Sequence, residues 1–146
     1  MNGSGTYALV IDLRIGICLR IGKLAIHNFV PGYYVYTGSA LGGLSGRLRH
    51  HLKLEKRLHW HIDYLLQEAE ITQIWLALGK CRLECIWNAI VNDLPEAISS
   101  ISGFGASDCH CSSHLTYFPT IPPFSIFEQR LRQRKLPKVY KVDLAK

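Results

Sequence analysis

The chain has 146 residues, of which 48% are hydrophobic, and a formal net charge of +6 at pH 7. This length and composition fit one compact domain with its own core, and they exclude a second full domain and a disordered chain. The apolar runs are far shorter than the roughly 20 residues that span a bilayer, and residues 1–4 lack the features of a secretion signal. We therefore expect a cytoplasmic protein with no membrane partner.

Three strands are predicted in the first forty residues. Residues 6–13 are β-branched or apolar on both alternating faces, which is typical of a strand inside a covered sheet. A turn at residues 14–16 leads into a second predicted strand at residues 17–21. Residues 33–37, which follow a Pro-Gly pair, consist of strong β-formers and predict a third strand.

Beyond residue 43 the spacing of the apolar residues changes to that of helices. It predicts helices in three segments, at residues 44–52, 62–69 and 83–94. Residues 71–78 are apolar and could form a further strand or a buried segment. Residues 103–105 and 119–123 are interpreted as loops because they are rich in glycine or proline.

The C-terminal segment carries nearly all of the excess positive charge. Residues 128–146 contain seven basic and two acidic residues, and the spacing of Phe127 and Leu131 predicts a short basic helix that ends before Pro137. We therefore divide the chain into a domain at residues 1–126 and a basic helix and tail at residues 127–146. A solvated helix face is the alternative interpretation of these charges.

Two short motifs and a predicted helix carry the candidate catalytic residues. Gly5-Thr6-Tyr7 is followed about thirty residues later by Tyr36-Thr37-Gly38, and then by Arg47 and His51, which lie on one face of the predicted helix. In this order and spacing they resemble the signature of the GIY-YIG nuclease superfamily. The resemblance covers roughly residues 5–92. Residues 103–118 resemble the hallmark of an uncharacterised prokaryotic branch of that superfamily.

The resemblance implies an α/β (α+β) fold in which helices flank a small three-stranded antiparallel sheet. It also implies a divalent-metal-dependent endonuclease that hydrolyses nucleic-acid phosphodiester bonds, in DNA rather than RNA. Tyr7 or Tyr36 would help to deprotonate the attacking water, and Arg47 would stabilise charge on the phosphoryl oxygens. Glu84 matches the position of the family's metal ligand and would hold one Mg²⁺ or Mn²⁺ ion. His51 would orient groups or carry protons.

Other basic residues are candidates for binding the nucleic-acid backbone, because each phosphate contact made by Lys or Arg adds affinity. These candidates are Arg49, Arg130, Arg132, Arg134 and Lys135. The sequence contains no element that would read bases, and it leaves open the form of the substrate and the oligomeric state. The neighbouring His59, Trp60 and His61 are interpreted as packing or helix-capping residues.

One departure from the family pattern supports a rival function. Many family members end the core with an asparagine near the active site, and this position has no clear counterpart here. Asn88, Ser113 and His114 are the alternatives that could take its place. A noncatalytic nucleic-acid-binding module on a degenerate nuclease fold is therefore the alternative to an enzyme.

The cysteines suggest a third possibility. Their odd number favours reduced thiols over a disulfide framework, and their Cys-x₃-Cys and Cys-x-Cys spacings depart from those usual in zinc sites. A zinc-stabilised protein-interaction domain, with His114 as a further ligand, is possible but disfavoured. The five residues are Cys18, Cys81, Cys85, Cys109 and Cys111.

Overall fold

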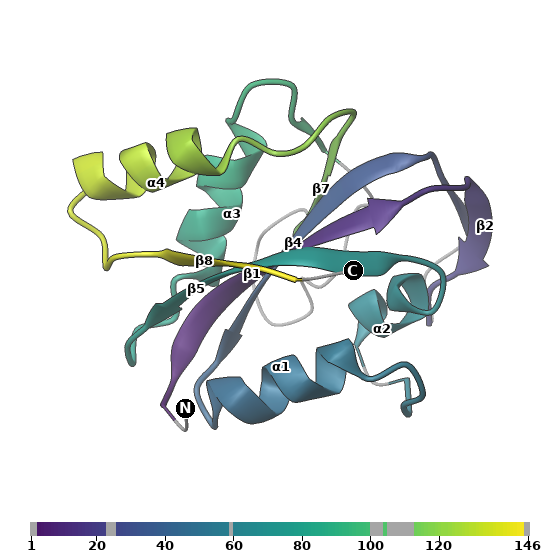
Figure 1. The fold of residues 1–146 in the computed structure, drawn as a ribbon, viewed down its shortest axis with the longest axis horizontal. Helices are drawn as coiled ribbons and strands as arrows, with labels where there is room; N and C mark the ends of the chain where they lie inside the picture. The colour runs from purple at the N-terminus through teal and green to yellow at the C-terminus, as the bar shows by residue number, and fades with distance from the viewer. Residues whose placement is uncertain (1–2, 23–25, 59, 100–103, 105–112, 145–146) are drawn as a thin grey trace.

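The computed structural model describes residues 3–22, 26–58, 60–99, 104 and 113–144 (Figure 1). Its helices and strands, in chain order, are β1 (Gly5–Leu13), β2 (Ile17–Arg20), β3 (Ile26–Phe29), β4 (Gly32–Ala40), α1 (Leu44–Leu52), α2 (His61–Leu66), β5 (Glu70–Leu78), α3 (Glu84–Asn92), β6 (Ile98–Ser99), β7 (Leu115–Phe118), α4 (Phe124–Gln133) and β8 (Tyr140–Asp143). The chain is thus a mixed α+β protein, as the sequence predicts. His59, Cys109, Cys111 and most of the glycine-rich hallmark segment lie outside the described residues.

The strands of the main sheet are antiparallel and lie in the order β6-β7-β4-β1-β5-β8. Strand β1 is central, because it pairs with β4 from Gly5↔Ala40 to Leu13↔Gly32 and with β5 on its other side. Eight of its nine residues are buried. The prediction that residues 6–13 form a strand inside a covered sheet is therefore confirmed.

The predicted three-stranded sheet is too small, and its membership differs from the prediction. The second predicted strand, β2, leaves the main sheet and forms a separate two-stranded hairpin with β3. Its residues alternate between half-buried and exposed, so one face of the strand is exposed to solvent. The main sheet instead gains β5 beside β1, and the short strands β6, β7 and β8 extend it to six.

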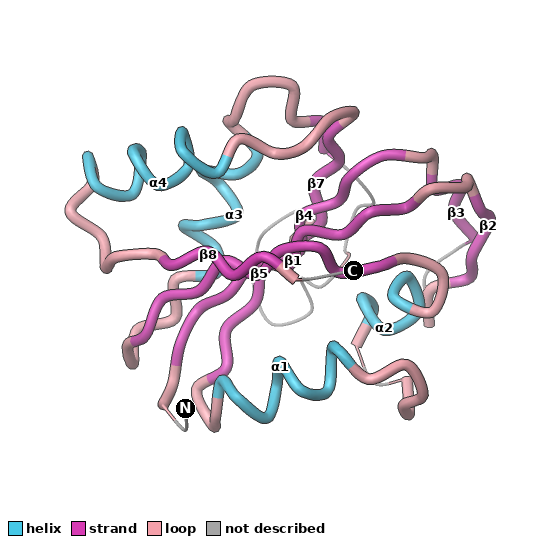
Figure 2. The backbone as a smooth tube through the Cα atoms, viewed as in Figure 1, coloured by secondary structure: helices cyan, strands magenta, loops and turns pink. Residues whose placement is uncertain are grey.

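Two groups of helices cover the two faces of the sheet (Figure 2). Because side chains alternate along a strand, Tyr7, Leu9 and Ile11 of β1 pack in the core cluster that includes residues of α1 and α2. Ala8 and Val10 pack in the second cluster, with residues of α3 and α4. The result is three layers, with α1 and α2 on one side of the sheet and α3 and α4 on the other.

The C-terminal residues belong to this layered core. Phe127 and Leu131 of the predicted basic helix are buried against α3 in the second cluster, together with Val139. Strand β8 then pairs with β5 along residues 140–143. Residues 127–146, set apart as a helix and tail in the sequence, therefore supply core side chains and a strand. Within the described residues, no helix is long and apolar enough to cross a membrane.

Candidate functional site

Strand pairing brings the two predicted motifs into contact. Tyr7 of β1 lies directly opposite Gly38 of β4 in the antiparallel register. A Cβ atom built on Gly38 would lie 2.6 Å from the Tyr7 hydroxyl oxygen, closer than real Cβ contacts. Glycine at position 38 therefore gives the Tyr7 ring the space to lie across β4.

Helix α1 places His51 over this strand pair. Tyr7 Oη and His51 Nε2 are joined by a hydrogen bond of 2.7 Å, and both residues are buried. The Tyr36 ring, which lies on the same face of the sheet as Tyr7, packs edge-on to the His51 ring at 6.1 Å between centroids. The two predicted tyrosines and the predicted histidine thus form one packed group. We call Tyr7, Tyr36 and His51 the tyrosine group.

Arg47 lies one helical turn before His51 and is held from two sides. Its Nη1 donates a hydrogen bond to the Ser39 carbonyl oxygen at 3.1 Å, and its guanidinium carbon lies 4.4 Å from the centre of the Trp60 ring. The first contact ties Arg47 to β4, and the second is a cation–π interaction with the residue that precedes α2. Arg47 is therefore fixed beside the tyrosines.

Burial controls the protonation of this group. It raises the pKa of Tyr7 to about 12, although the charge of Arg47 and its hydrogen bond to the phenol lower that pKa in part. Burial also raises the pKa of Tyr36 well above its ordinary value, and it lowers the pKa of His51 to about 3. At neutral pH the phenols and the imidazole are therefore uncharged, and the Arg47 guanidinium lies beside them.

Glu84 approaches this site from the other layer. It is the first residue of α3, whose start is tied to β1 by a hydrogen bond of 3.3 Å from the Leu83 N–H to Thr6 Oγ1. The negative charge of Glu84 raises the pKa of both Tyr7 and Tyr36. Its carboxylate therefore acts on the same end of the β1–β4 pair as Arg47.

The Glu84 carboxylate already faces two side chains. Arg82 Nη2 lies 2.5 Å from Oε1, and His114 Nδ1 lies 3.7 Å from Oε2. Among the described residues, no three His, Cys, Asp or Glu side chains gather to form a metal cage. A single carboxylate is nevertheless the protein ligand that suits a hydrated Mg²⁺, and the Arg82 side chain is half exposed and could move aside. The residues fit one hydrated cation bound through Glu84.

The three candidates for the absent asparagine lie together beside Glu84. Asn88, one helical turn further along α3, is buried and donates a hydrogen bond of 2.6 Å to the Ser113 carbonyl oxygen. His114 follows Ser113 and approaches the carboxylate. On the next turn Asn92 accepts a 2.7 Å hydrogen bond from Thr116. Glu84, Asn88 and Asn92 are polar residues at positions i, i+4 and i+8 of α3. This spacing was the signal for the arrangement in the sequence, but the helix was interpreted from its apolar residues alone.

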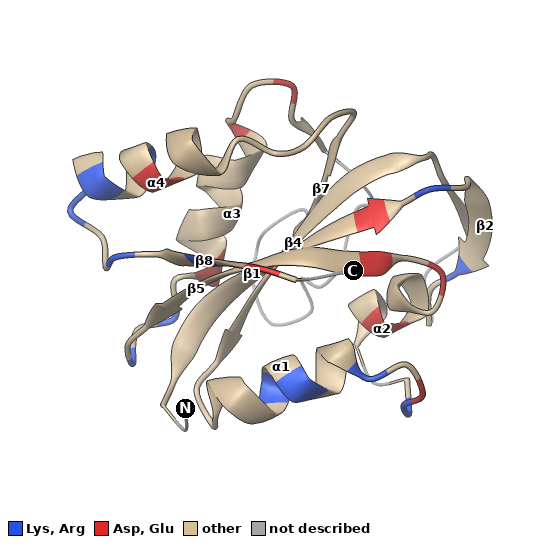
Figure 3. Cartoon of the chain, in the orientation of Figure 1, with Lys and Arg blue, Asp and Glu red and all other residues tan. Residues whose placement is uncertain are grey.

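The predicted nucleic-acid-binding residues separate into two places. Arg49 is exposed on α1, in the same layer as Tyr7 and His51. The other four lie on or just after α4, across the sheet (Figure 3). Arg130 donates a 2.7 Å hydrogen bond to the Asp93 carbonyl oxygen, and Arg132 pairs with Glu128. Arg134 and Lys135 are exposed at the end of the helix.

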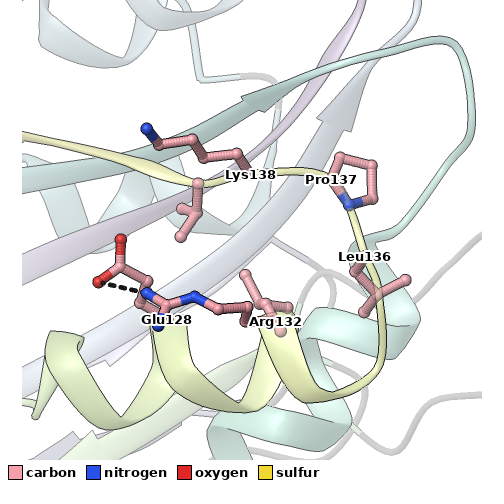
Figure 4. A pocket seen from close by; sticks show the side chains of 7 residues that line it. Glu128, Arg132, Leu136, Pro137 and Lys138 are labelled. Atoms are coloured by element: carbon pink, nitrogen blue, oxygen red, sulfur yellow. Dashed lines mark ion pairs between the residues drawn. The ribbon is translucent and has the colours of Figure 1, made fainter.

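A hollow of about 390 Å³ lies between α4 and the segment that leads into β8 (Figure 4). Its lining is apolar at Leu131 and Val139, with Lys138 and the Glu128–Arg132 ion pair also contributing. It lies on the side of the sheet away from Tyr7 and His51. The charges of α4 and the tyrosine group therefore do not form one site.

Asp63 is the buried residue of this region that sequence reasoning missed. It lies on α2 with no exposed surface, accepts a 2.9 Å hydrogen bond from the Trp60 N–H, and has Oδ2 3.1 Å from His50 Nε2. The interpretation of residues 59–61 as packing or capping residues is confirmed at Trp60, which is the N-cap of α2. The signal in the sequence for a buried Asp63 was its position next to Ile62, on the apolar face of a short helix.

Comparison with known proteins gave one result. A family model described as "Domain of unknown function DUF123" matches residues 6–135. Searches of curated proteins and of solved structures returned no match. The matched range includes every residue of the tyrosine group and Glu84.

Proposed function

The chain belongs to the DUF123 family, and we propose that it is a divalent-metal-dependent endonuclease that hydrolyses phosphodiester bonds in nucleic acid. The observation that carries the proposal is the group formed by Tyr7, His51 and Arg47. A phenol hydrogen-bonded to an uncharged imidazole, with a fixed guanidinium beside it and a carboxylate near the same strands, fits the needs of phosphoryl transfer.

Each side chain has a separate role in this proposal. Tyr7 accepts a proton from the attacking water and is hydrogen-bonded to His51, which can take up the phenol's own proton. Arg47 binds a nonbridging phosphate oxygen and stabilises the charge that develops on it. Tyr36 packs on His51 and limits access of bulk water. Glu84 would hold the Mg²⁺ or Mn²⁺ ion, which would supply positive charge to stabilise the transition state.

The resemblance to GIY-YIG nucleases supports the same function independently of the contacts. It favours DNA over RNA as the substrate. The odd number of cysteines, which favours reduced thiols, supports the cytoplasm as the place of action. Arg49 is the phosphate-binding candidate nearest the tyrosine group along the chain, and its exposure leaves it accessible to a backbone phosphate. The α4 residues Arg130, Arg132, Arg134 and Lys135 are proposed as weaker, more distant contacts, because α4 covers the opposite face.

The test is cleavage of a panel of linear, nicked, branched and single-stranded substrates, each with Mg²⁺, Mn²⁺ or a chelator. Three variants then separate catalysis from folding. Glu84→Gln and Arg47→Ala should each slow cleavage by roughly 10²-fold or more, and Tyr7→Phe by about 10²- to 10⁴-fold. Thermal midpoints should change little for Glu84→Gln, whose side chain retains its shape.

Matched controls come from exposed residues of the same types. Glu68→Gln, Arg14→Ala and Tyr140→Phe should cleave at the wild-type rate. Cleavage by Glu84→Gln at the wild-type rate would contradict the metal role. Equal losses in the matched variants would show that the assay follows stability and not chemistry.

A second candidate is a noncatalytic nucleic-acid-binding module. The observation that favours it is the 2.5 Å contact between Arg82 and Glu84, which gives the carboxylate a cationic partner within the chain. A wild-type protein that binds the panel but cleaves none of it, with either metal, would favour this candidate. The Arg82→Ala variant then separates two causes of inactivity. Because this change releases Glu84, the variant should cleave the substrates if Arg82 blocks the metal, and it should stay inactive if Arg82 does not.

A further inference from the structure

A buried aspartate stands directly behind the histidine that contacts Tyr7. Asp63 Oδ1 lies 3.9 Å from His51 Nδ1, on the side of the imidazole opposite the 2.7 Å hydrogen bond from Nε2 to Tyr7. Tyr7, His51 and Asp63 therefore form a row that crosses from β1 through α1 to α2. None of the three side chains is open to solvent.

The contacts of Asp63 hold its carboxylate in place. The Trp60 N–H donates to Oδ2 at 2.9 Å, and His50 Nε2 approaches the same oxygen at 3.1 Å. Since a buried carboxylate needs hydrogen-bonding partners, these contacts fix Oδ2 and leave Oδ1 directed toward His51. His51 Nδ1 is itself buried and has no hydrogen-bond partner within the described part of the chain.

We propose that Asp63 is a positioning residue for His51: its carboxylate holds the imidazole in the tautomer that carries its proton on Nδ1, so that Nε2 is the acceptor for the Tyr7 proton. The chemical use of this arrangement rests on the proposed function, whereas the tautomer itself does not. A carboxylate near Nδ1 favours a proton there, and one ring nitrogen of a neutral imidazole must then be an acceptor. Tyr7 consequently donates and Nε2 accepts.

The proton balance of the step involves these residues, the substrate and solvent water. An O–H bond of the attacking water breaks, and its proton goes to the Tyr7 oxygen while the Tyr7 proton goes to His51 Nε2. The water oxygen forms a bond to phosphorus, and the bond from phosphorus to the leaving oxygen breaks. The leaving oxygen keeps the electron pair of that bond and takes a proton from solvent water, and His51 later returns its proton to solvent through Tyr7. The imidazolium formed on His51 keeps its Nδ1–H directed at the Asp63 carboxylate, which stabilises it.

The charged and titratable groups around His51 make Asp63 the source of that stabilisation. Arg47 and His50 from α1, together with Lys56 from the segment after it, lower the pKa of His51, and burial lowers it most. Asp63 from α2 raises that pKa. Tyr7 and Tyr36 face the ring from β1 and β4 and stay neutral near pH 7.

The first test is the ¹⁵N NMR spectrum of the histidine rings in the full chain near neutral pH, with the His51 signals assigned from a His51→Gln variant. The expected result is a neutral imidazole protonated on Nδ1. A His51 ring protonated on Nε2 in the wild type overturns the proposal. This measurement needs neither cleavage activity nor an Asp63 variant that folds.

The second test compares Asp63→Asn with His50→Gln by the same spectrum. Asp63→Asn should move the His51 proton wholly or partly to Nε2, whereas His50→Gln removes the other imidazole from Asp63 and should leave the His51 tautomer unchanged. An unchanged His51 tautomer in a folded Asp63→Asn variant contradicts the role of Asp63. A merely structural Asp63 would change the melting temperature without changing the tautomer.

Cleavage kinetics separate this inference from the proposed function. If the wild type cleaves nucleic acid, Asp63→Asn should lower kcat by about 10²-fold and leave KM nearly unchanged, because proton transfer is affected and substrate binding is not. Full activity in that variant overturns the proposal while the nuclease function stands. If the wild type cleaves nothing, the nuclease function fails, and the tautomer result alone decides whether Asp63 orients His51.

Discussion

His51 links the candidate site to the acid stability of the fold. Burial lowers its pKa from the ordinary 6.5 to about 3, so between these values the unfolded chain holds a proton that the folded protein does not. The stabilising effect is complete above about pH 6.5 and is lost as the pH falls toward about 3. Unfolding in urea should therefore show a free energy that decreases by up to about 1.4 kcal/mol per pH unit across this window.

A His51→Gln variant isolates this contribution. It cannot titrate, so its free energy of unfolding should depend less steeply on pH than that of the wild type, with the two curves compared after normalisation near neutral pH. Groups distant from His51 affect both proteins alike, and the difference between the curves therefore reports His51 and its coupling to Asp63. Parallel curves would contradict the lowered pKa.

Individual site residues were predictable to different degrees. Tyr7, Tyr36, Arg47 and His51 were predicted because the order of their motifs resembles that of GIY-YIG nucleases, and the structure packs the four together. Asp63 was not predictable, because an aspartate on a short helix is ordinarily a surface residue. Only the packing of α2 beside α1 turns that aspartate toward His51 of the preceding helix.

Two groups of exposed basic residues, one in and after α1 and one in and after α4, should contribute unequally to nucleic-acid binding, because the two helices cover opposite faces of the sheet. Replacing the exposed Arg49, Lys53 and Arg57 with glutamine should weaken binding of a short duplex and flatten the dependence of affinity on salt, because about 0.9 counterions are released per phosphate contact. Replacing Arg132, Arg134 and Lys135 removes three positive charges as well but should change the salt slope less. Fluorescence anisotropy across a salt series measures both.

The two triple variants control for each other, since each removes three charges and leaves the core intact. A larger change in salt slope for the α4 variant would place the nucleic acid on the face covered by α3 and α4. Deletion of the whole C-terminal segment is a poorer experiment, because it would also remove Phe127 and Leu131 from the core.

Elements with an apolar pattern were predicted well, and the short sheet strands were not. The pattern of α1 and the two-sided apolar run of β1 identify them from sequence alone. Strand β8 has only four residues, so the alternation of Tyr140 and Val142 with polar neighbours is too short to distinguish a strand from a loop. What places it in the sheet is backbone pairing with β5, a long-range interaction that side-chain patterns do not encode.

At the scale of the whole molecule, the site draws on both outer layers. Tyr7, Arg47 and His51 lie between the sheet and α1, and Glu84 begins a helix of the opposite layer. The end of the β1–β4 pair is where the two groups influence each other, as the effect of Glu84 on the pKa of Tyr7 indicates. The relative positions of α1 and α3 on the sheet therefore set the geometry of the site.

The outer edge of the sheet gives the last prediction. Strand β8 pairs with residues 73–76 of β5, and the Leu144 N–H donates a further 3.0 Å hydrogen bond to the Thr72 carbonyl oxygen. Removing residues 140–146 deletes the exposed side chains of β8 and the partly buried Leu144, so little core packing is lost. It leaves β5 as an edge strand with unpaired N–H and C=O groups, which can pair with the same edge of another copy. The truncated chain should therefore self-associate at concentrations where the full chain does not, with only a modest fall in melting temperature.

Light scattering after size-exclusion chromatography over a range of concentrations measures this self-association. The control is Val142→Thr, which keeps the strand but reduces its apolar surface. If the truncated chain has the same mass as the full chain at every concentration, then β8 is not what protects the β5 edge.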